Sequence, residues 1–153
     1  MKKFELTSET KINIFGKKLF RIKALISFGN VEAGETGGWV EKEENVNQSG
    51  DAWVSGNAEV SGNAWVSGNA EVSGNAEVSG NADYTTIRGF GTQFRTTTFF
   101  RCKDKQVKVS CGCFYGTIPE FREQVKNTRD GKIAEEYLMI ADLMEKHFAE
   151  EAK

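Results

Sequence analysis

The chain has 153 residues, 39% of them hydrophobic, and a formal net charge of -2, which suits one or two small domains with modest cores. This charge gives no general attraction to duplex nucleic acid or anionic lipid, and no apolar run approaches the ~20 residues of a membrane span. The sequence has 16 glycines but 1 proline, a balance that favours many tight corners over a disordered linker.

The N-terminal segment predicts strands. Its first residues include two lysines but no apolar core of a secretion signal, so we expect an intracellular, cytoplasmic protein. Residues 12–30 predict two strands that are separated at residues 16–18. We expect residues 1–30 to form a strand region that caps the segment after it.

Residues 51–84 repeat a six-residue unit, Val-Ser-Gly-Asn-Ala followed by one variable residue. Self-similarity at six residues is typical of a parallel β-helix. The alanine and the valine stand two positions apart in each short strand, so both point inward and the variable residue between them points outward. Gly-Asn suits the corners, because both residues tolerate left-handed backbone angles. The predicted outward residues are Trp53, Glu59, Trp65, Glu71, Glu77 and Asp83.

This pattern, over about residues 31–84, resembles the hexapeptide-repeat proteins, in which three units make one triangular coil of a left-handed β-helix. The resemblance implies trimers packed side by side. It also implies that residue 53 lies beneath 71, 59 beneath 77 and 65 beneath 83. The spacing of eight between Val46 and Val54 indicates a two-residue insertion at a corner, which places Trp39, Trp53 and Trp65 on three different faces.

Residues 85–153 predict a β-hairpin and two helices. The hairpin arms are residues 96–102 and 106–114, with a turn at residues 103–105. Thr117 and Glu120 form a capping box, with Pro119 in the first turn of a helix that runs to about residue 128. A second helix, from about residue 132 to 149, carries an apolar stripe that we interpret as core: Ile133, Tyr137, Ile140, Met144 and Phe148.

The three cysteines, Cys102, Cys111 and Cys113, indicate free thiols, because their number is odd and the chain is expected to be intracellular. Cys111 and Cys113 would suit a metal, but zinc sites usually have a wider spacing and a second pair of ligands. The only histidine, His147, lies far away in the sequence. We therefore expect buried structural thiols, no metal and no cofactor.

These segments together predict a mainly β fold. A left-handed parallel β-helix of hexapeptide repeats spans residues 31–84, after an N-terminal strand region at 1–30 and before a C-terminal β-hairpin with two α-helices at 85–153. Nearly the whole chain, through "LFRIKALISFGNVEAGETGGWVEKEENV" and "RTTTFFRCKDKQVKVSCGCFYGTIPEFREQVKNT", is similar to small phage- and prophage-encoded hexapeptide-repeat proteins of uncertain function. That resemblance implies a viral setting and no particular reaction.

The choice between enzyme and binding protein depends on what the repeat lacks. Hexapeptide-repeat acyltransferases commonly place a histidine as general base at the trimer interface, and this repeat has none. The sequence also shows no Ser–His–Asp set and no P-loop. We therefore expect a non-enzymatic binding protein. A hexapeptide-repeat acyltransferase is the first alternative, and a structural spacer in a phage assembly is the second.

The candidate binding residues are three arginines and two tryptophans. Arg88, Arg95 and Arg101 lie in a basic and aromatic stretch that suits an anion, although they could instead pair with the outward carboxylates. Trp53 and Trp65 suit stacking on a ligand or packing between subunits. We expect a cytoplasmic homotrimer that counteracts host defence by holding a small anionic ligand, such as a signalling nucleotide, or by binding a host protein. Membranes and duplex nucleic acid are not expected partners.

Overall fold

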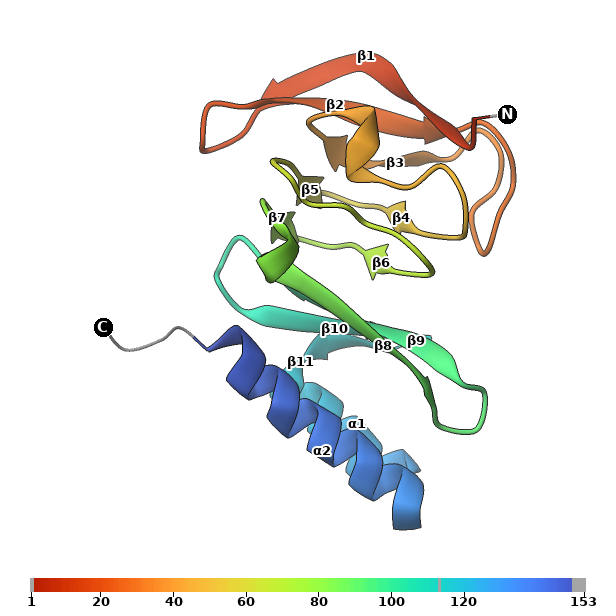
Figure 1. Cartoon of the computed structure of the whole chain (residues 1–153), viewed down its shortest axis with the longest axis vertical. Helices are drawn as coiled ribbons and strands as arrows, with labels where there is room; N and C mark the ends of the chain where they lie inside the picture. Colours follow the sequence, from red (N-terminus) through yellow and green to blue (C-terminus); the bar gives the residue numbers. More distant parts are fainter. Residues whose placement is uncertain (1, 113, 150–153) are drawn as a thin grey trace.

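Antiparallel strands and helices cover the two ends of the repeat segment in the computed structural model, which describes residues 2–112 and 114–149 (Figure 1). One end is formed by β1 (Phe4–Ile12), β2 (Lys18–Ala24) and β3 (Thr36–Val40). The middle holds the 3-10 helix η1 (Glu43–Asn45) and four two-residue strands, β4 (Trp53–Val54), β5 (Glu59–Val60), β6 (Glu71–Val72) and β7 (Glu77–Val78). The other end holds η2 (Asn81–Asp83), β8 (Tyr84–Phe90), β9 (Arg95–Arg101), β10 (Val107–Cys111), β11 (Phe114–Thr117), α1 (Ile118–Thr128) and α2 (Gly131–Phe148).

The predicted fold class, a mainly β chain built on a left-handed parallel β-helix, is wrong. The chain is a mixed α/β structure with three separate sheets: a mixed sheet β1-β2-β3-β5-β7, an antiparallel sheet β11-β10-β9-β8 and a pair β4-β6. Parallel pairing joins β3 to β5, β5 to β7 and β4 to β6, whereas β1 with β2 and the strands of the C-terminal sheet pair antiparallel. The physical reason is that the strict repeat, residues 51–84, covers fewer than two of the 18-residue intervals between paired strands, so only two or three short strands can stack in parallel before the antiparallel strands take over.

Within the repeat, two of the three predicted register pairs are confirmed, and the third, residue 65 beneath 83, is not among the strand pairings of the described residues. Trp53 pairs with Glu71 and Glu59 pairs with Glu77, each partner 18 residues further along the chain. Val46 pairs with Val66 across 20 residues, as a two-residue insertion requires. Ten of the predicted inward residues are buried: Ala52, Val54, Ala58, Val60, Ala64, Val66, Ala70, Val72, Ala76 and Val78. The prediction is wrong for Ala82, which is exposed in η2, where the chain leaves the repeat. The repeat therefore encloses a continuous apolar interior.

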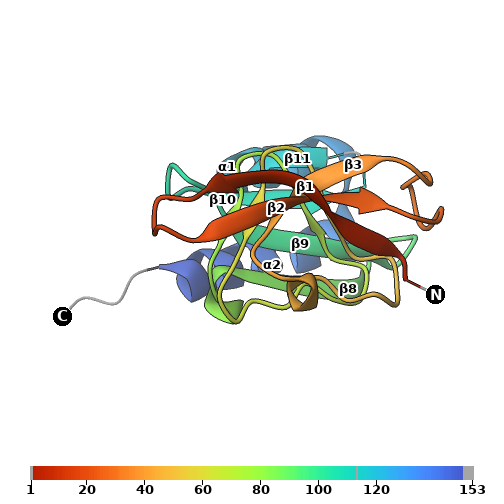
Figure 2. The ribbon, with the colours of Figure 1, turned by 90° about the horizontal axis from the view of Figure 1, so that it is seen from above.

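The N-terminal strands close one end of this interior. Figure 2 shows, from above, that β1 and β2 lie over the turns of the repeat. The predicted break between two strands is confirmed near residues 16–18. The first strand, β1, ends at Ile12, so it lies N-terminal to the range of residues 12–30 that was predicted to hold both strands. Phe4 is fully buried in the same core as the repeat valines, and its ring meets the edge of Trp53 at 6.1 Å between centroids. One five-stranded sheet therefore runs from β1 and β2 into the repeat.

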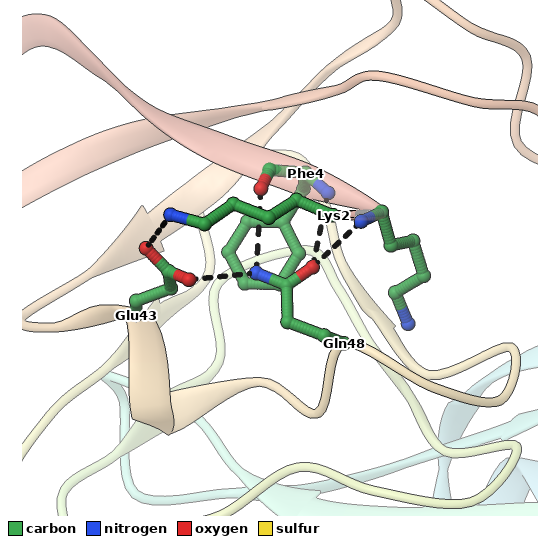
Figure 3. Close-up of polar contacts among 5 residues, drawn as sticks. Lys2, Phe4, Glu43 and Gln48 are labelled. Atoms are coloured by element: carbon green, nitrogen blue, oxygen red, sulfur yellow. Dashed lines mark hydrogen bonds and ion pairs between the residues drawn. The ribbon is translucent and has the colours of Figure 1, made fainter.

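Gln48 fastens the start of β1 to the loop after η1 (Figure 3). Its Oε1 accepts from the Lys3 N–H (2.7 Å) and the Phe4 N–H (3.2 Å), while its Nε2 donates to the Phe4 carbonyl (3.3 Å). The same Nε2 donates to Glu43, which also pairs with Lys2 at 3.0 Å. One side chain thus satisfies backbone groups of Phe4 as a neighbouring strand would.

Strand β9 closes the other end and separates two cores. Phe100 packs with the repeat valines, whereas Phe99 packs with both helices, because successive side chains of a strand point to opposite faces. The hairpin of β9 and β10 and the capping box of Thr117 and Glu120 are confirmed. The apolar stripe of α2 is confirmed as core, and the helices cover the face of the sheet that lies away from the repeat (Figure 1).

Glu59 ties both end layers to the middle of the repeat. Its carboxylate is 2.9 Å from Lys11 Nζ of β1 and 2.8 Å from Lys103 Nζ of the β9–β10 turn, and the residue is 6% exposed. Burial alone would raise the pKa of Glu59, but the hydrogen bonds and charges of the two lysines outweigh it and hold the pKa below its ordinary value. Glu77 stacks on Glu59, and its pKa is raised by burial and by the charge of Glu59.

The Gln48 contacts predict a graded loss of stability. Gln48→Ala removes the bridging amide and should lower the free energy of unfolding by about 1–3 kcal/mol. Gln48→Glu should cost at least as much at neutral pH, because a carboxylate oxygen then faces the Phe4 carbonyl and Glu43. Urea unfolding measures both variants, with Gln106→Glu, in an exposed turn, as the matched control. A Gln48→Glu protein as stable as the wild type would contradict this account.

The contacts of Glu59 and Glu77 predict that glutamate-to-glutamine substitution changes the free energy of unfolding in opposite directions at the two positions. Glu59→Gln should destabilise the protein by about 1–3 kcal/mol at neutral pH, since two lysines lose a partly buried partner. Glu77→Gln should stabilise it by up to about 1 kcal/mol, since it removes one of two stacked like charges. The pKa of Glu59 is lowered in the folded state, so its contribution is present at neutral pH and is lost as the pH falls below its ordinary value of 4.5.

Urea unfolding at about pH 7 and about pH 3 tests both directions. The deficit of Glu59→Gln should shrink at the lower pH, and so should the gain of Glu77→Gln, because Glu77 is then protonated. Glu135→Gln, on the exposed side of α2, is the control and should change neither value. If both substitutions changed the free energy of unfolding equally, Glu59 would not be a stabilising ion-pair partner and Glu77 would not be a destabilising like charge.

Candidate functional site

Arg101 is committed to contacts within the chain. Its Nε lies 3.2 Å from the Asp83 carboxylate, one Nη donates to the Phe148 carbonyl (2.9 Å), and the guanidinium lies over the Phe148 ring. These contacts join β9, η2 and the end of α2. The alternative that an arginine pairs with an outward carboxylate of the repeat is therefore observed for Arg101.

The tryptophans have different environments. Trp53 is 5% exposed and packs against Phe4 and Phe28, so its ring lies in the core beneath the N-terminal strands. Trp39 is also buried, with Lys11 Nζ and the Arg21 guanidinium over its ring. Trp65 is 53% exposed. Among these three rings, Trp65 alone is open to a ligand or a subunit.

Arg95 lines a cavity of about 240 Å³ at the seam between the antiparallel sheet and the helices. We call this the arginine cavity. The ends of β8, β9, β10 and β11 meet there with the C-terminal half of α1 and the first turns of α2. Its described lining residues are Phe90, Thr92, Gln93, Arg95, Cys111, Gly112, Phe114, Phe121, Gln124, Val125, Thr128, Arg129 and Tyr137.

Aromatic side chains and two cations form the arginine cavity. Phe121 is held edge-on by Phe99 and Tyr137, at centroid distances of 6.1 and 5.8 Å, which fixes an apolar floor. Arg95 and Arg129 add two positive charges, and no carboxylate is among the described lining residues. Within the described part of the chain, neither arginine makes an ion pair.

Two glycines give the polar groups of the cavity their room. A Cβ on Gly112 would lie 2.6 Å from a guanidinium nitrogen of Arg95, and a Cβ on Gly91 would lie 2.5 Å from the Tyr137 hydroxyl. Both glycines have positive φ, +58° and +78°, where a side chain is strained. The absence of a side chain at these two positions thus leaves space for Arg95 and Tyr137, which line the cavity.

The cavity combines two guanidinium groups with the hydroxyl of Tyr137. Burial raises the pKa of Tyr137, and the nearby Cys111 raises it further against the opposing effect of the two arginines. The Tyr137 hydroxyl is therefore a neutral donor at ordinary pH. Arg95 donates to Gln93 Oε1, and Arg129 donates to the Thr128 carbonyl at 3.4 Å, so both guanidinium groups keep unused N–H donors.

The thiols belong to two settings. Burial raises the pKa of Cys102 to about 11, so this thiol behaves as a small apolar group, as predicted. Cys111 is half-buried in the arginine cavity, and its sulfur accepts from the Thr97 hydroxyl at 3.1 Å. Cys113 lies outside the described residues. Among residues 2–112 and 114–149, no group of three or more His, Cys, Asp or Glu side chains could hold a metal ion.

Arg88 lines a second depression, which shares Arg95 and Gly112 with the arginine cavity. We call it the central hollow; its lining is Asn30, Asn69, Glu71, Arg88, Phe94, Arg95, Thr96 and Gly112. A third depression, the acidic hollow, shares Asn30, Asn69 and Glu71 with it and adds Gly29, Val31, Glu35, Asp51, Trp53, Ser55 and Ser73. The three depressions therefore adjoin one another in this order.

The sequence found part of this site. It named Arg88 and Arg95, which the structure brings to one hollow, and Arg101, which lies elsewhere in an ion pair. It missed Arg129 and Tyr137 as members of the cavity. Arg129 stood in the sequence only as the end of a predicted helix, and Tyr137 only as one member of an apolar stripe. The sequence feature that could have pointed to Arg129 was its place at the predicted end of a helix, where a basic residue stands next to a turn.

Comparisons with known proteins add no family. No family model matches the chain, and no curated protein matches it. In the described ranges, no helix combines the length and the apolar character that crossing a membrane requires.

Proposed function

We propose that this protein is a non-enzymatic binding protein that holds a small anionic ligand in the arginine cavity. The observation that carries the proposal is the pair Arg95 and Arg129, which line one aromatic-floored cavity that has no carboxylate among its described lining residues. Guanidinium groups recognise carboxylate and phosphate through paired hydrogen bonds. An anion there meets two uncompensated cations in a partly enclosed, mostly apolar setting.

The lining also defines the rest of the ligand. An apolar or aromatic part can rest against Phe121 and Tyr137, while the amides of Gln93 and Gln124 can donate and accept hydrogen bonds. A nucleotide combines a stacking base, polar base edges and a phosphate, so it belongs to the class that the cavity suits. This matches the ligand class expected from the basic and aromatic stretch of the sequence.

Binding without catalysis is the proposed mode of action. The chain's single histidine, His147, is exposed near the end of α2 and is not among the described residues of the cavity. The residues at hand bind and orient: Arg95 and Arg129 pair with the anion, and Tyr137 donates a hydrogen bond.

The setting that we propose is the cytoplasm. Cys102 and Cys111 are free thiols, which agrees with a reducing compartment. A viral origin and a role against host defence rest on the sequence resemblance alone. In that setting, the protein would withhold a signalling molecule or a host protein.

We propose a homotrimer, with Trp65 in the contact between subunits. Its ring is 53% exposed, and its backbone is fixed: the Trp65 N–H donates to Asn81 Oδ1 at 3.0 Å, and its carbonyl accepts from the Tyr84 hydroxyl. A large apolar ring on a fixed backbone is a common centre of subunit contacts.

The cavity predicts that Arg95→Ala and Arg129→Ala each abolish binding of the anion. Isothermal titration calorimetry should detect heat with at least one member of a panel of adenosine monophosphate, cyclic dinucleotides, cyclic oligonucleotides and phenyl phosphate. Native mass spectrometry should show an unchanged trimer mass for Arg95→Ala. Lys126→Ala removes an exposed cation from α1 outside the cavity and should bind as the wild type does.

Two results would count against this function. The absence of heat from every nucleotide up to about tens of micromolar protein and ligand removes the nucleotide class. Binding that survives both arginine substitutions removes the cavity as the site. Loss of the trimer in Arg95→Ala would instead make Arg95 a structural residue.

The subunit contact has its own test. Trp65→Glu places a charge at the proposed interface and should convert the trimer to monomer, because a buried aromatic contact of this kind contributes about 2 kcal/mol or more. Native mass spectrometry and sedimentation measure the change. Met139→Glu alters another exposed apolar residue, on α2, and should leave the mass unchanged. A Trp65→Glu protein of wild-type mass excludes this interface.

A further inference from the structure

The three depressions carry opposite charges at their two ends. The acidic hollow contains Glu35, Asp51 and Glu71, and its lining includes no lysine or arginine among the described residues. The buried Lys3 ammonium interacts with the charge of Asp51 and donates to the Gly50 and Ala52 carbonyls, so Asp51 is partly compensated, and carboxylates still outnumber cations at this end. The arginine cavity contains Arg95 and Arg129 and no described carboxylate. The central hollow joins them, since it shares residues with both. In Figure 1, β4, β6 and the β8–β9 turn, which contribute to this path, lie on one side of the molecule.

Amide side chains line the path between the charged ends. Asn30 and Asn69 belong to both the acidic and the central hollow. An asparagine side chain donates and accepts hydrogen bonds, as a peptide backbone does. Phe94, 66% exposed with φ +53°, adds an apolar side chain to the central hollow. These groups match an extended chain of alternating amide groups and side chains.

Three observations together define a ligand with a fixed direction. A cation fits the end with Glu35 and Asp51, and an anion fits the end with Arg95 and Arg129. The anionic end also has the apolar floor formed by Phe121 and its neighbours, so the group that carries the anion has an apolar part. A polypeptide C-terminus combines a carboxylate, an adjacent side chain and an amide backbone in one segment.

We propose that the path binds the C-terminal segment of a partner protein. The terminal carboxylate pairs with Arg95 and Arg129, an apolar last side chain lies on the aromatic floor, and a lysine or arginine a few residues earlier lies in the acidic hollow. The inference rests on the proposed function, because it names the carboxylate of a polypeptide as the anion. It is favoured over a nucleic acid strand by the carboxylates of the acidic hollow, which would repel a phosphate backbone.

Peptide binding to the wild-type protein tests the inference without a question of folding. The probe is a labelled hexapeptide with the sequence Gly-Lys-Ser-Ala-Ala-Phe and a free C-terminus, followed by fluorescence anisotropy. A series of such peptides places the lysine at the third, fourth, fifth or sixth position from the C-terminus. The series covers the number of residues that could separate the arginine cavity from the acidic hollow. For the best register, amidation of the C-terminus should weaken binding by about tenfold or more, and lysine-to-glutamate exchange by about fivefold.

Protein variants assign the two ends. Arg95→Ala and Arg129→Ala should weaken binding of the free-acid peptide and remove the preference for acid over amide. Asp51→Asn combined with Glu35→Gln should remove the preference for lysine over glutamate and keep the preference for the acid. Lys126→Ala and Glu123→Gln change charges on α1 outside all three depressions and should alter neither preference.

The outcomes separate this inference from the proposed function. If small anions bind through Arg95 and Arg129 but no peptide binds, or acid and amide peptides bind equally, the peptide inference is wrong and the anion site stands. If neither small anions nor free-acid peptides depend on the two arginines, both proposals fail. Peptide binding that prefers the acid, prefers lysine and is displaced by phenyl phosphate supports the full proposal.

Discussion

The structure depends on closing the two ends of a short apolar interior. Four repeat units each supply a strand of two residues, the unit of Val66 supplies an isolated bridge, and the buried valines Val54, Val60, Val66, Val72 and Val78 stack through the middle of the chain. Burial of a valine side chain contributes about 1.5–3 kcal/mol to stability. A valine at an uncovered end of the stack would face water and lose this contribution. A stack this short has ends nearly as large as its sides. The antiparallel strands and the helices are best understood as the covers that such a stack requires.

The covers are attached through a few polar side chains at defined points. Gln48 holds β1 by its backbone, and Glu59 reaches a lysine in each cover from the middle of the stack. At the opposite end, Thr98 and Ser110 contact the Glu71 unit, the first at its N–H and the second at its carboxylate. Surface residues from distant parts of the sequence meet where these layers join. The acidic and central hollows lie where the stack meets a cover, and the arginine cavity lies within the C-terminal cover, between its sheet and its helices.

Local structure could be predicted from the sequence where a periodic pattern or a capping signal was present. The 18-residue register, the capping box at Thr117 and the α2 stripe are confirmed because each depends on neighbouring residues. The fold class was wrong because the repeat dominated the interpretation. Tyr84 occupies the next valine position of the repeat, yet it begins the seven-residue strand β8. The sequence predicted the β9–β10 hairpin of the four-stranded sheet that this strand joins, but it carried no such signal for β8 or β11.

The candidate site was predicted in part for the same reason. Arg95 stood out in a basic and aromatic stretch, but its partner Arg129 comes from the far end of α1, and only the packing of α1 on the sheet brings them to one cavity. Trp53 suggested an exposed ring because its position in the unit points out of the stack. Phe4 of β1 and Phe28, in the segment between β2 and β3, cover that position, which no pattern within the repeat could reveal.

The 18-residue pairing interval restricts how the length of this chain can change in evolution. Insertion or deletion of three units keeps the two covers facing the same direction and changes only the distance between them. Insertion or deletion of one or two units would rotate the C-terminal cover relative to the N-terminal one, so the depressions would no longer adjoin. Homologues of different length should therefore differ by whole multiples of 18 residues in this segment, and such a change would lengthen or shorten the path between the acidic hollow and the arginine cavity without altering its two ends.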